Sequence, residues 1–277
     1  MSVSKPFHFS IIFYSFLFCF IIINKVNAQK RDNVQTNSYR VSNNVVIDGK
    51  TTEWKDFFFK TYNKHNQIFY TIGNDDNKLY LFVKAPAPIT VDKLITGGLT
   101  LTVSHNLSAK RKNDKNNKSI TFPVHEYTYS ETIQGPWAYQ AFKSDTIGNK
   151  RQIDSLMHVY NKKATSMLNQ IALKGINDTI SSTNNNYGIE AAIQFTNKME
   201  LIYELAVPLN YLGLDIKNLT QFSYNIKLNG YPLAVKRKPS LFPSPIVKIA
   251  SDAPVDFDYL FLNSVSDVWG KYTLANK

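Results

Sequence analysis

Histidines are the first residues in this sequence to examine for chemistry, because they serve as metal ligands and as general acids or bases. Beyond residue 28 they are His65, His105, His125 and His158, and no two of them stand at a spacing typical of a metal site. The chain also lacks the G-x-S-x-G, H-E-x-x-H and glycine-rich phosphate-binding motifs. We therefore predict no catalytic residue, no metal site and no cofactor.

The acidic residues lead to the same prediction. Glycosidases need two carboxylates that face each other across a cleft. Glu126 and Glu131 are the nearest candidates, but two acids in one irregular segment often occur by chance. His125 precedes Glu126, and adjacent side chains of an extended chain point to opposite faces. The chain is therefore predicted not to be an enzyme.

Aromatic side chains suggest a different chemistry, the binding of sugars. A flat aromatic face binds the apolar side of a sugar ring, while polar groups bind its rim. Residues 124–150 form a long irregular stretch rich in aromatic residues, and such stretches are often functional. Trp269 lies near the C-terminus beside Tyr272. The predicted ligand-binding residues are Trp137, Tyr139, Tyr127 and Trp269. The alternative is local packing for Trp137 and packing at a strand end for Trp269.

The elements that must position these residues are β-strands. Residues 68–73 and 79–83 alternate in side-chain character, which is typical of strands, and Asn74-Asp75-Asp76-Asn77 between them is typical of a hairpin turn. The oxygens of this turn are the kind that calcium prefers, but they are too few for a complete site. We expect them to cap the backbone amides of the turn.

A family resemblance emerges when this hairpin is read with the segment before it. The pattern I-D-G-x-x-x-E-W, followed by a hairpin ending in N-D-D-x-x-L-Y-L-x-V, resembles the front half of family 9 carbohydrate-binding modules. It is also similar to the wider group of DOMON-like β-sandwiches. The matching residues are Ile47, Asp48, Gly49, Glu53, Trp54, Asn74, Asp75, Asp76, Leu79, Tyr80, Leu81 and Val83.

The resemblance is confined to residues 45–84 and implies a fold more directly than a ligand. It implies two antiparallel sheets and a non-catalytic, glycan-binding role. In the family a pair of tryptophans clamps a terminal sugar, but the matching motif does not include those tryptophans. Trp54 belongs to the E-W motif, and we expect it to be buried.

The rest of the chain fits a single all-β domain. Alternating or short apolar runs predict strands, and residues 153–171 repeat their apolar positions with a helical period. The predicted fold class is mostly β, an antiparallel β-sandwich of jelly-roll or immunoglobulin-like type with one inserted α-helix near residues 151–171. The further strands are predicted at residues 45–47, 94–103, 119–122, 189–195, 201–207, 222–228, 255–262 and 268–274, with loops at 61–67 and 177–186.

The N-terminal residues have the layout of a secretory signal peptide. Lys5 and His8 precede an apolar run at residues 11–23, which is too short to span a membrane comfortably, and Val26-Asn27-Ala28 offers a cleavage site. An uncleaved anchor is the alternative. We predict a signal peptide at 1–28, a disordered leader at 29–44 and a single β-sandwich domain at 45–277. Cys19 leaves with the signal peptide, so no disulfide is expected.

The basic character of the chain leaves several partners open. The formal net charge of +11 is compatible with nucleic acid, anionic lipid or acidic glycan. No nucleic-acid motif accompanies the clumped basic residues, which are interpreted as solvated loops. We predict a secreted or periplasmic glycan-binding protein without a membrane span after cleavage of the signal. The alternative is a structural or protein-interaction module of the cell envelope, with an envelope protein as its partner.

Overall fold

A computed structural model describes residues 31–42, 45–54, 60–108, 114–124, 150–230 and 257–276 of the chain. The chain divides into two compact units, Met1–Arg31 and Asp32–Lys277. Arg31 is the one described residue of the first unit, so the predicted signal peptide lies outside the described residues. No helix in the described ranges is long and apolar enough to cross a membrane.

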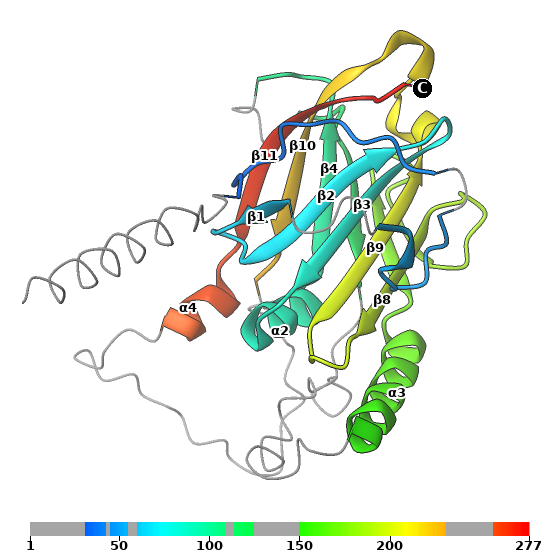
Figure 1. Cartoon of the computed structure of the whole chain (residues 1–277). Helices are drawn as coiled ribbons and strands as arrows, with labels where there is room; N and C mark the ends of the chain where they lie inside the picture. The colour runs from blue at the N-terminus through cyan, green and yellow to red at the C-terminus, as the bar shows by residue number, and fades with distance from the viewer. Residues whose placement is uncertain are drawn as a thin grey trace, which may run out of the picture. The chain divides into compact units, whose positions relative to one another are not determined.

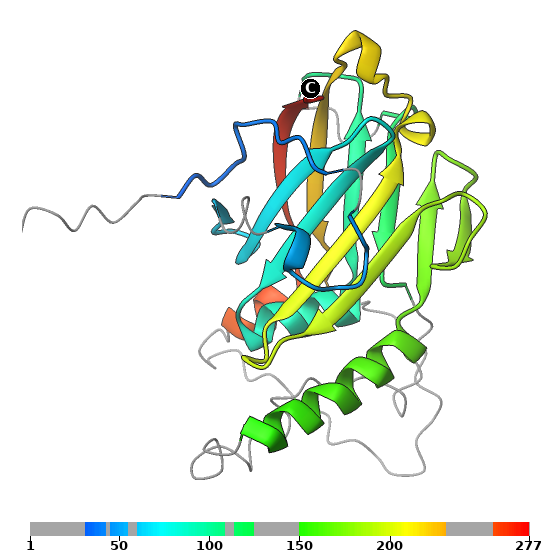
Figure 2. The same ribbon diagram turned by 45° about the vertical axis from the view of Figure 1, so that its right-hand side comes forward.

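Two antiparallel sheets form the second unit, and they confirm the predicted mostly-β sandwich (Figures 1 and 2). Sheet A has the strand order β1-β2-β3-β9-β8, and sheet B has the order β11-β10-β4-β5-β6-β7. The strands of sheet A are β1 (Thr61–Asn63), β2 (Ile68–Asn74), β3 (Lys78–Ala85), β9 (Leu201–Pro208) and β8 (Glu190–Phe195). Those of sheet B are β11 (Ser266–Thr273), β10 (Gln221–Leu228), β4 (Leu99–Ser104), β5 (Lys118–Phe122), β6 (Gln170–Lys174) and β7 (Thr179–Ser182).

Helices occupy the connections between strands. They are α2 (Pro88–Gly97), α3 (Lys150–Met167) and α4 (Phe257–Asn263), with short 3-10 turns η2 (Thr52–Trp54), η4 (Leu209–Leu212) and η5 (Ile216–Asn218). Helix α3 is the predicted insertion and packs against β8 (Figure 2). Helices α2 and α4 contact each other near the ends of β3 and β10 (Figure 1).

The core lies between the two sheets, because alternate side chains of each strand face inward. Leu81 and Leu205 from sheet A and Leu101 and Ile226 from sheet B belong to one buried cluster. The hydroxyl groups of Tyr70 and Tyr224 lie 3.0 Å apart and join β2 to β10 across this core. Gly270 makes room for the Tyr224 ring, because a Cβ on that glycine would collide with it.

A second apolar cluster covers the outer face of sheet A. Segment 45–54 crosses this face (Figure 2) and brings Trp54 down onto Tyr80 and Phe82. The predicted strand at residues 45–47 is wrong, because Val45 and Ile47 pack on the cluster from an irregular segment. The cluster consists of Val41, Trp54, Tyr80, Phe82, Ile202 and Ala206.

Several other boundaries differ from the prediction. Residues 94–103 do not form one strand, because residues 94–97 belong to helix α2. This helix begins with Pro88 and buries Val91, Leu94 and Ile95 at helical spacing. It ends before Gly98, whose φ is +74°. Residues 257–263 form helix α4 instead of a strand. Strand β1 and strand β7 lie in predicted loops, and β6 takes residues 170–171 from the end of the predicted helix.

Residues 32–42, in the segment where a disordered leader was predicted, lie along the edge of β2. The Gln35 side chain accepts a hydrogen bond from the Ile72 amide and donates one to the Ile72 carbonyl, both 2.8 Å long. Further along, the Val41 amide donates to the Asn74 carbonyl at 2.9 Å. The segment therefore forms hydrogen bonds with the backbone groups of Ile72 and Asn74 in β2, which lie beyond the three residues that β1 pairs with.

Candidate functional site

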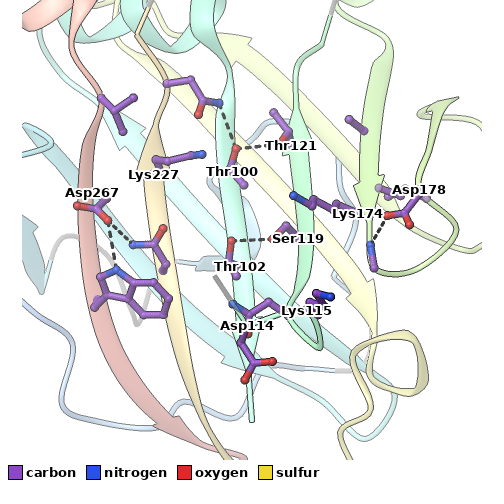
Figure 3. A pocket seen from close by; sticks show the side chains of 18 residues that line it. Thr100, Thr102, Asp114, Lys115, Ser119, Thr121, Lys174, Asp178, Lys227 and Asp267 are labelled. Atoms are coloured by element: carbon purple, nitrogen blue, oxygen red, sulfur yellow. Dashed lines mark hydrogen bonds between the residues drawn. The ribbon is translucent and has the colours of Figure 1, made fainter. Parts of the chain in front are cut away.

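The outer face of sheet B is hollowed into a groove of about 980 Å³. Strands β11, β10, β4, β5 and β6 form its floor, and residues 114–117 and 175–178 form part of its wall (Figure 3). The inward residues of these strands are apolar and pack in the core. The alternate residues face outward and therefore line the groove. Those outward residues are mostly hydroxyl, amide or charged side chains.

Cross-strand pairing arranges these side chains in two rows that run across the strands. The first row is Asp267, Lys227, Thr100, Thr121 and Ala172. The second row is Trp269, Asn225, Thr102, Ser119 and Lys174. With neighbouring strands about 4.8 Å apart, each row spans roughly 19 Å from β11 to β6.

The centre of the groove is a block of four hydroxyl groups from β4 and β5. Thr100 Oγ1 lies 2.8 Å from Thr121 Oγ1, and Thr102 Oγ1 lies 2.8 Å from Ser119 Oγ (Figure 3). Each hydroxyl has one hydrogen and two acceptor sites, so a hydrogen bond within a pair leaves donor and acceptor capacity for a ligand. The pairs also fix the hydroxyl rotamers before a ligand binds.

Trp269 lies at the β11 end of the second row. Its half-buried indole donates a hydrogen bond of 3.2 Å from Nε1 to Asp267 Oδ2. The same carboxylate oxygen accepts a bond of 3.0 Å from Asn225 Nδ2, which also donates to the Val268 carbonyl. Asp267 therefore holds the indole and the amide in fixed positions, and the ring has one partly exposed surface in the groove.

Charged side chains complete the groove. Lys227 is half-buried on β10 and Lys174 is exposed on β6. Burial lowers the pKa of Lys227, the Asp267 carboxylate raises it, and the positive charge of Lys174 lowers it. The positive charges of the two lysines therefore repel each other across the hydroxyl block.

Of the four predicted ligand-binding residues, Trp269 lines this groove, and its role in binding stays a prediction. The other predicted site residues, Trp137, Tyr139 and Tyr127, lie outside the described residues, as do His125, Glu126 and Glu131. Sequence reasoning missed the hydroxyl block and Lys227, although the alternation of threonines with Leu99, Leu101 and Val103 was visible. That alternation shows which residues face outward, but not which strands lie next to one another.

The remaining histidines are not assembled into a site in the described part of the chain. His65 and His158 are exposed, and His105 Nε2 lies 2.9 Å from the Leu212 carbonyl. Within the same ranges, no group of three His, Cys, Asp or Glu residues is placed to hold a metal ion.

Trp54 has a structural position on the opposite sheet. Its indole is 1% exposed and donates a 2.6 Å hydrogen bond to Oε1 of Glu204, which is fully buried. Oε2 of Glu204 accepts bonds from the Asp48 and Gly49 amides at 2.9 and 2.7 Å. Burial raises the pKa of Glu204 to about 7, although the three N–H donors lower it. This carboxyl group therefore holds segment 45–54 against the outer face of sheet A.

The Asn74–Asn77 turn uses its side chains as caps. Asp75 Oδ1 accepts hydrogen bonds from the Asn77 and Lys78 amides, each 2.7 Å long, and its Oδ2 accepts one from the Tyr80 hydroxyl. Asn74 Oδ1 accepts from the Tyr272 hydroxyl and the Ala275 amide. The turn therefore ties the hairpin to the C-terminal strand.

Comparison with known proteins gives one finding at the level of the fold. No protein-family model and no curated protein matches the sequence. Among solved structures, the chain is similar to a family 9 carbohydrate-binding module from Caldicellulosiruptor kristjanssonii, solved in complex with glucose. The two share 8% sequence identity with a TM-score of 0.39, over 87% of this chain and 97% of that one. The glucose belongs to that module, so the ligand of this chain must be inferred from its own groove.

Proposed function

We propose that this protein is an exported, non-catalytic β-sandwich that binds a glycan in the groove on the outer face of sheet B. The observation that carries the proposal is the second row of the groove. It places an aromatic ring, an amide and two hydroxyl groups in line across neighbouring strands. Sugars need both kinds of surface, because a sugar ring has an apolar face and a rim of hydroxyl groups.

The length of the groove fits an oligosaccharide better than a single sugar. Both rows cross five strands, so a chain of sugars lying across the strands meets a polar or aromatic side chain at each strand of the second row and a polar side chain at four of the five strands of the first, where β6 contributes Ala172. The hydroxyl pairs and the bonds to Asp267 hold these side chains in place, which lowers the entropy lost when a ligand binds. The sequence prediction of export adds that such a protein would meet glycans outside the cytoplasm.

The test is a calorimetric titration of the purified protein with neutral and acidic oligosaccharides. We expect Trp269→Ala to weaken binding by at least about fivefold, the size of a lost aromatic contact. Thr102→Val removes a hydroxyl without changing the shape of the side chain and should weaken binding to a similar or smaller extent. Tyr211→Ala is the matched control, because Tyr211 is a half-buried aromatic residue on η4 that does not line the groove.

The outcomes separate the competing assignments. No saturable binding to any sugar would overturn the proposal and favour the interaction module of the cell envelope. Equal binding by Trp269→Ala and Tyr211→Ala would remove Trp269 from the site. If Trp137→Ala then abolished binding, the glycan site would lie in residues 124–150, where Trp137, Tyr139 and Tyr127 remain predicted ligand contacts.

A further inference from the structure

Two lysines lie on opposite sides of the hydroxyl block at the centre of the groove. Lys227 projects from β10 and Lys174 from β6, with Thr100, Thr102, Ser119 and Thr121 between them (Figure 3). Three strand spacings separate β10 from β6, which is roughly 14 Å. In the described part of the chain, neither lysine side chain forms a hydrogen bond or an ion pair.

The carboxylates of the groove are engaged by the protein's own N–H groups. Asp178 Oδ1 accepts a 2.7 Å bond from the Gly175 amide, and Asp114 Oδ1 accepts a 3.0 Å bond from the Asn116 amide. Asp267 Oδ2 accepts bonds from the Asn225 amide and the Trp269 indole. These bonds fix the positions of the three carboxylates but leave their negative charges in place, and Lys115, Lys174 and Lys227 line the same groove with three positive charges. Of these lysines, Lys227 and Lys174 lie on either side of the hydroxyl block.

Lys227 indicates the charge of the ligand more directly than Lys174 does, because Lys227 is half-buried and Lys174 is exposed. A positive charge that is partly removed from water is stabilised by an anion placed beside it. Burial lowers the Lys227 pKa most, the carboxylate of its cross-strand neighbour Asp267 raises it, and the positive charge of Lys174 lowers it. The net shift is downward, so Asp267 offsets the loss of hydration only in part. A negatively charged ligand would add an anion that accepts a hydrogen bond from the Lys227 ammonium group, which Asp267 does not do in this structure.

From these contacts we infer that the groove takes an acidic glycan. Its anionic groups pair with Lys227 and Lys174, while its ring hydroxyls bond to the threonine and serine hydroxyls between the two lysines. A charge-assisted bond to each lysine adds affinity that a neutral sugar does not gain. This inference rests on the proposed function, since it assigns a class of glycan to the same groove.

Carboxylate and sulfate groups share the chemistry that would recognise these lysines, so the experiment has an arm for each. Uronate oligosaccharides, such as oligogalacturonate and hyaluronan fragments, are titrated beside their carboxyl-reduced counterparts. Sulfated oligosaccharides are titrated beside their desulfated counterparts. Each pair keeps the same sugar backbone, and carboxyl reduction or desulfation puts a neutral hydroxyl group in place of the anionic group. A difference in affinity within a pair therefore reports the exchange of an anion for a hydroxyl group.

The expected result is that at least one acidic member binds about tenfold or more tightly than its neutral counterpart, as for one charge-assisted hydrogen bond. Raising the salt concentration should weaken that binding, because exposed charges are screened. Lys227→Met and Lys174→Met should each remove most of the preference while retaining the apolar stem of the side chain. Lys163→Met, an exposed lysine on α3 that does not line the groove, is the control and should bind like the unchanged protein.

Two contrary results have different meanings. If neutral and acidic members bind equally well, or the lysine variants keep the preference, the acidic-glycan inference is overturned and glycan binding in the groove stands. If no member of any pair binds, both the inference and the proposed function are overturned.

Discussion

The indole Nε1 of Trp54 donates a 2.6 Å hydrogen bond to Oε1 of Glu204, 150 residues further along the chain. Trp54 belongs to the segment that crosses the outer face of sheet A, and Glu204 lies on β9 in that sheet. The same indole stacks on Phe82 with ring centroids 5.3 Å apart. This one residue therefore fastens segment 45–54 to two neighbouring strands through both a polar and an apolar contact.

Replacing Trp54 by alanine should destabilise the protein by about 3–5 kcal/mol, because it leaves a cavity beside Phe82 and removes the hydrogen-bond donor to Oε1 of the buried Glu204. The measurement is chemical denaturation followed by circular dichroism. Trp269→Ala is the comparison, since Trp269 is half-buried and should cost clearly less. Equal losses for the two variants would show that Trp269 is as structural as Trp54.

Removing the hydroxyl of Tyr70 should lower the free energy of unfolding by about 1–3 kcal/mol, because its partners are buried. Tyr70 Oη accepts a 2.9 Å bond from the Gln35 amide and lies 3.0 Å from the Tyr224 hydroxyl. Tyr70→Phe and Tyr224→Phe should be non-additive in a double-mutant cycle. Tyr62→Phe, on β1 in the same sheet, is half-buried and should change stability little. Additive losses would mean that the two hydroxyl groups do not interact.

Lys93 gives a prediction about pH. It is fully buried on α2, with Nζ 3.0 Å from Ser266 Oγ and 4.0 Å from the centroid of the Phe261 ring. Burial lowers the pKa of Lys93 from 10.5 to about 8. Between these two values the unfolded chain binds more protons than the folded one, so the contribution of Lys93 to stability rises with pH from about 8 to 10.5 and is lost as pH falls.

The matched variant for this prediction is Lys93→Met, which keeps the stem and removes the charge. It should be more stable than the unchanged protein at pH 7, and the difference should shrink as pH approaches 10. Denaturant unfolding at several pH values measures both proteins. A difference that stays constant between pH 7 and 10 would show that Lys93 does not titrate in this range.

Calcium and its removal should leave the stability of the protein unchanged. Both carboxylate oxygens of Asp75 accept hydrogen bonds from donors within the chain, so a calcium ion would have to displace caps of the turn. Thermal unfolding with added calcium and with EDTA makes the comparison. A higher Tm with calcium, lost in Asp76→Asn, would instead place a calcium site at this turn.

The sequence by itself determined the fold class and most of the strands. Alternation in residues 68–73, 79–83, 201–207 and 222–228 predicted strands that the structure contains, because a period of two follows directly from one buried face. The helical period of residues 153–171 likewise predicted α3. Periodicity failed where a short element carries little pattern, as at residues 257–262, which were predicted as part of a strand and belong to helix α4.

Only the tertiary structure decided the groove. The types of Thr102, Ser119, Lys174, Asn225 and Trp269 are plain in the sequence, but their alignment in one row depends on the strand order β11-β10-β4-β5-β6. In that order β10 pairs with β4, although the two strands lie far apart in the sequence, and local periodicity carries no information about which strands pair. The hydrogen bond between Trp54 and Glu204 could not be predicted from the sequence for the same reason. The two residues are 150 positions apart, and only the fold brings the indole N–H to the buried carboxyl group.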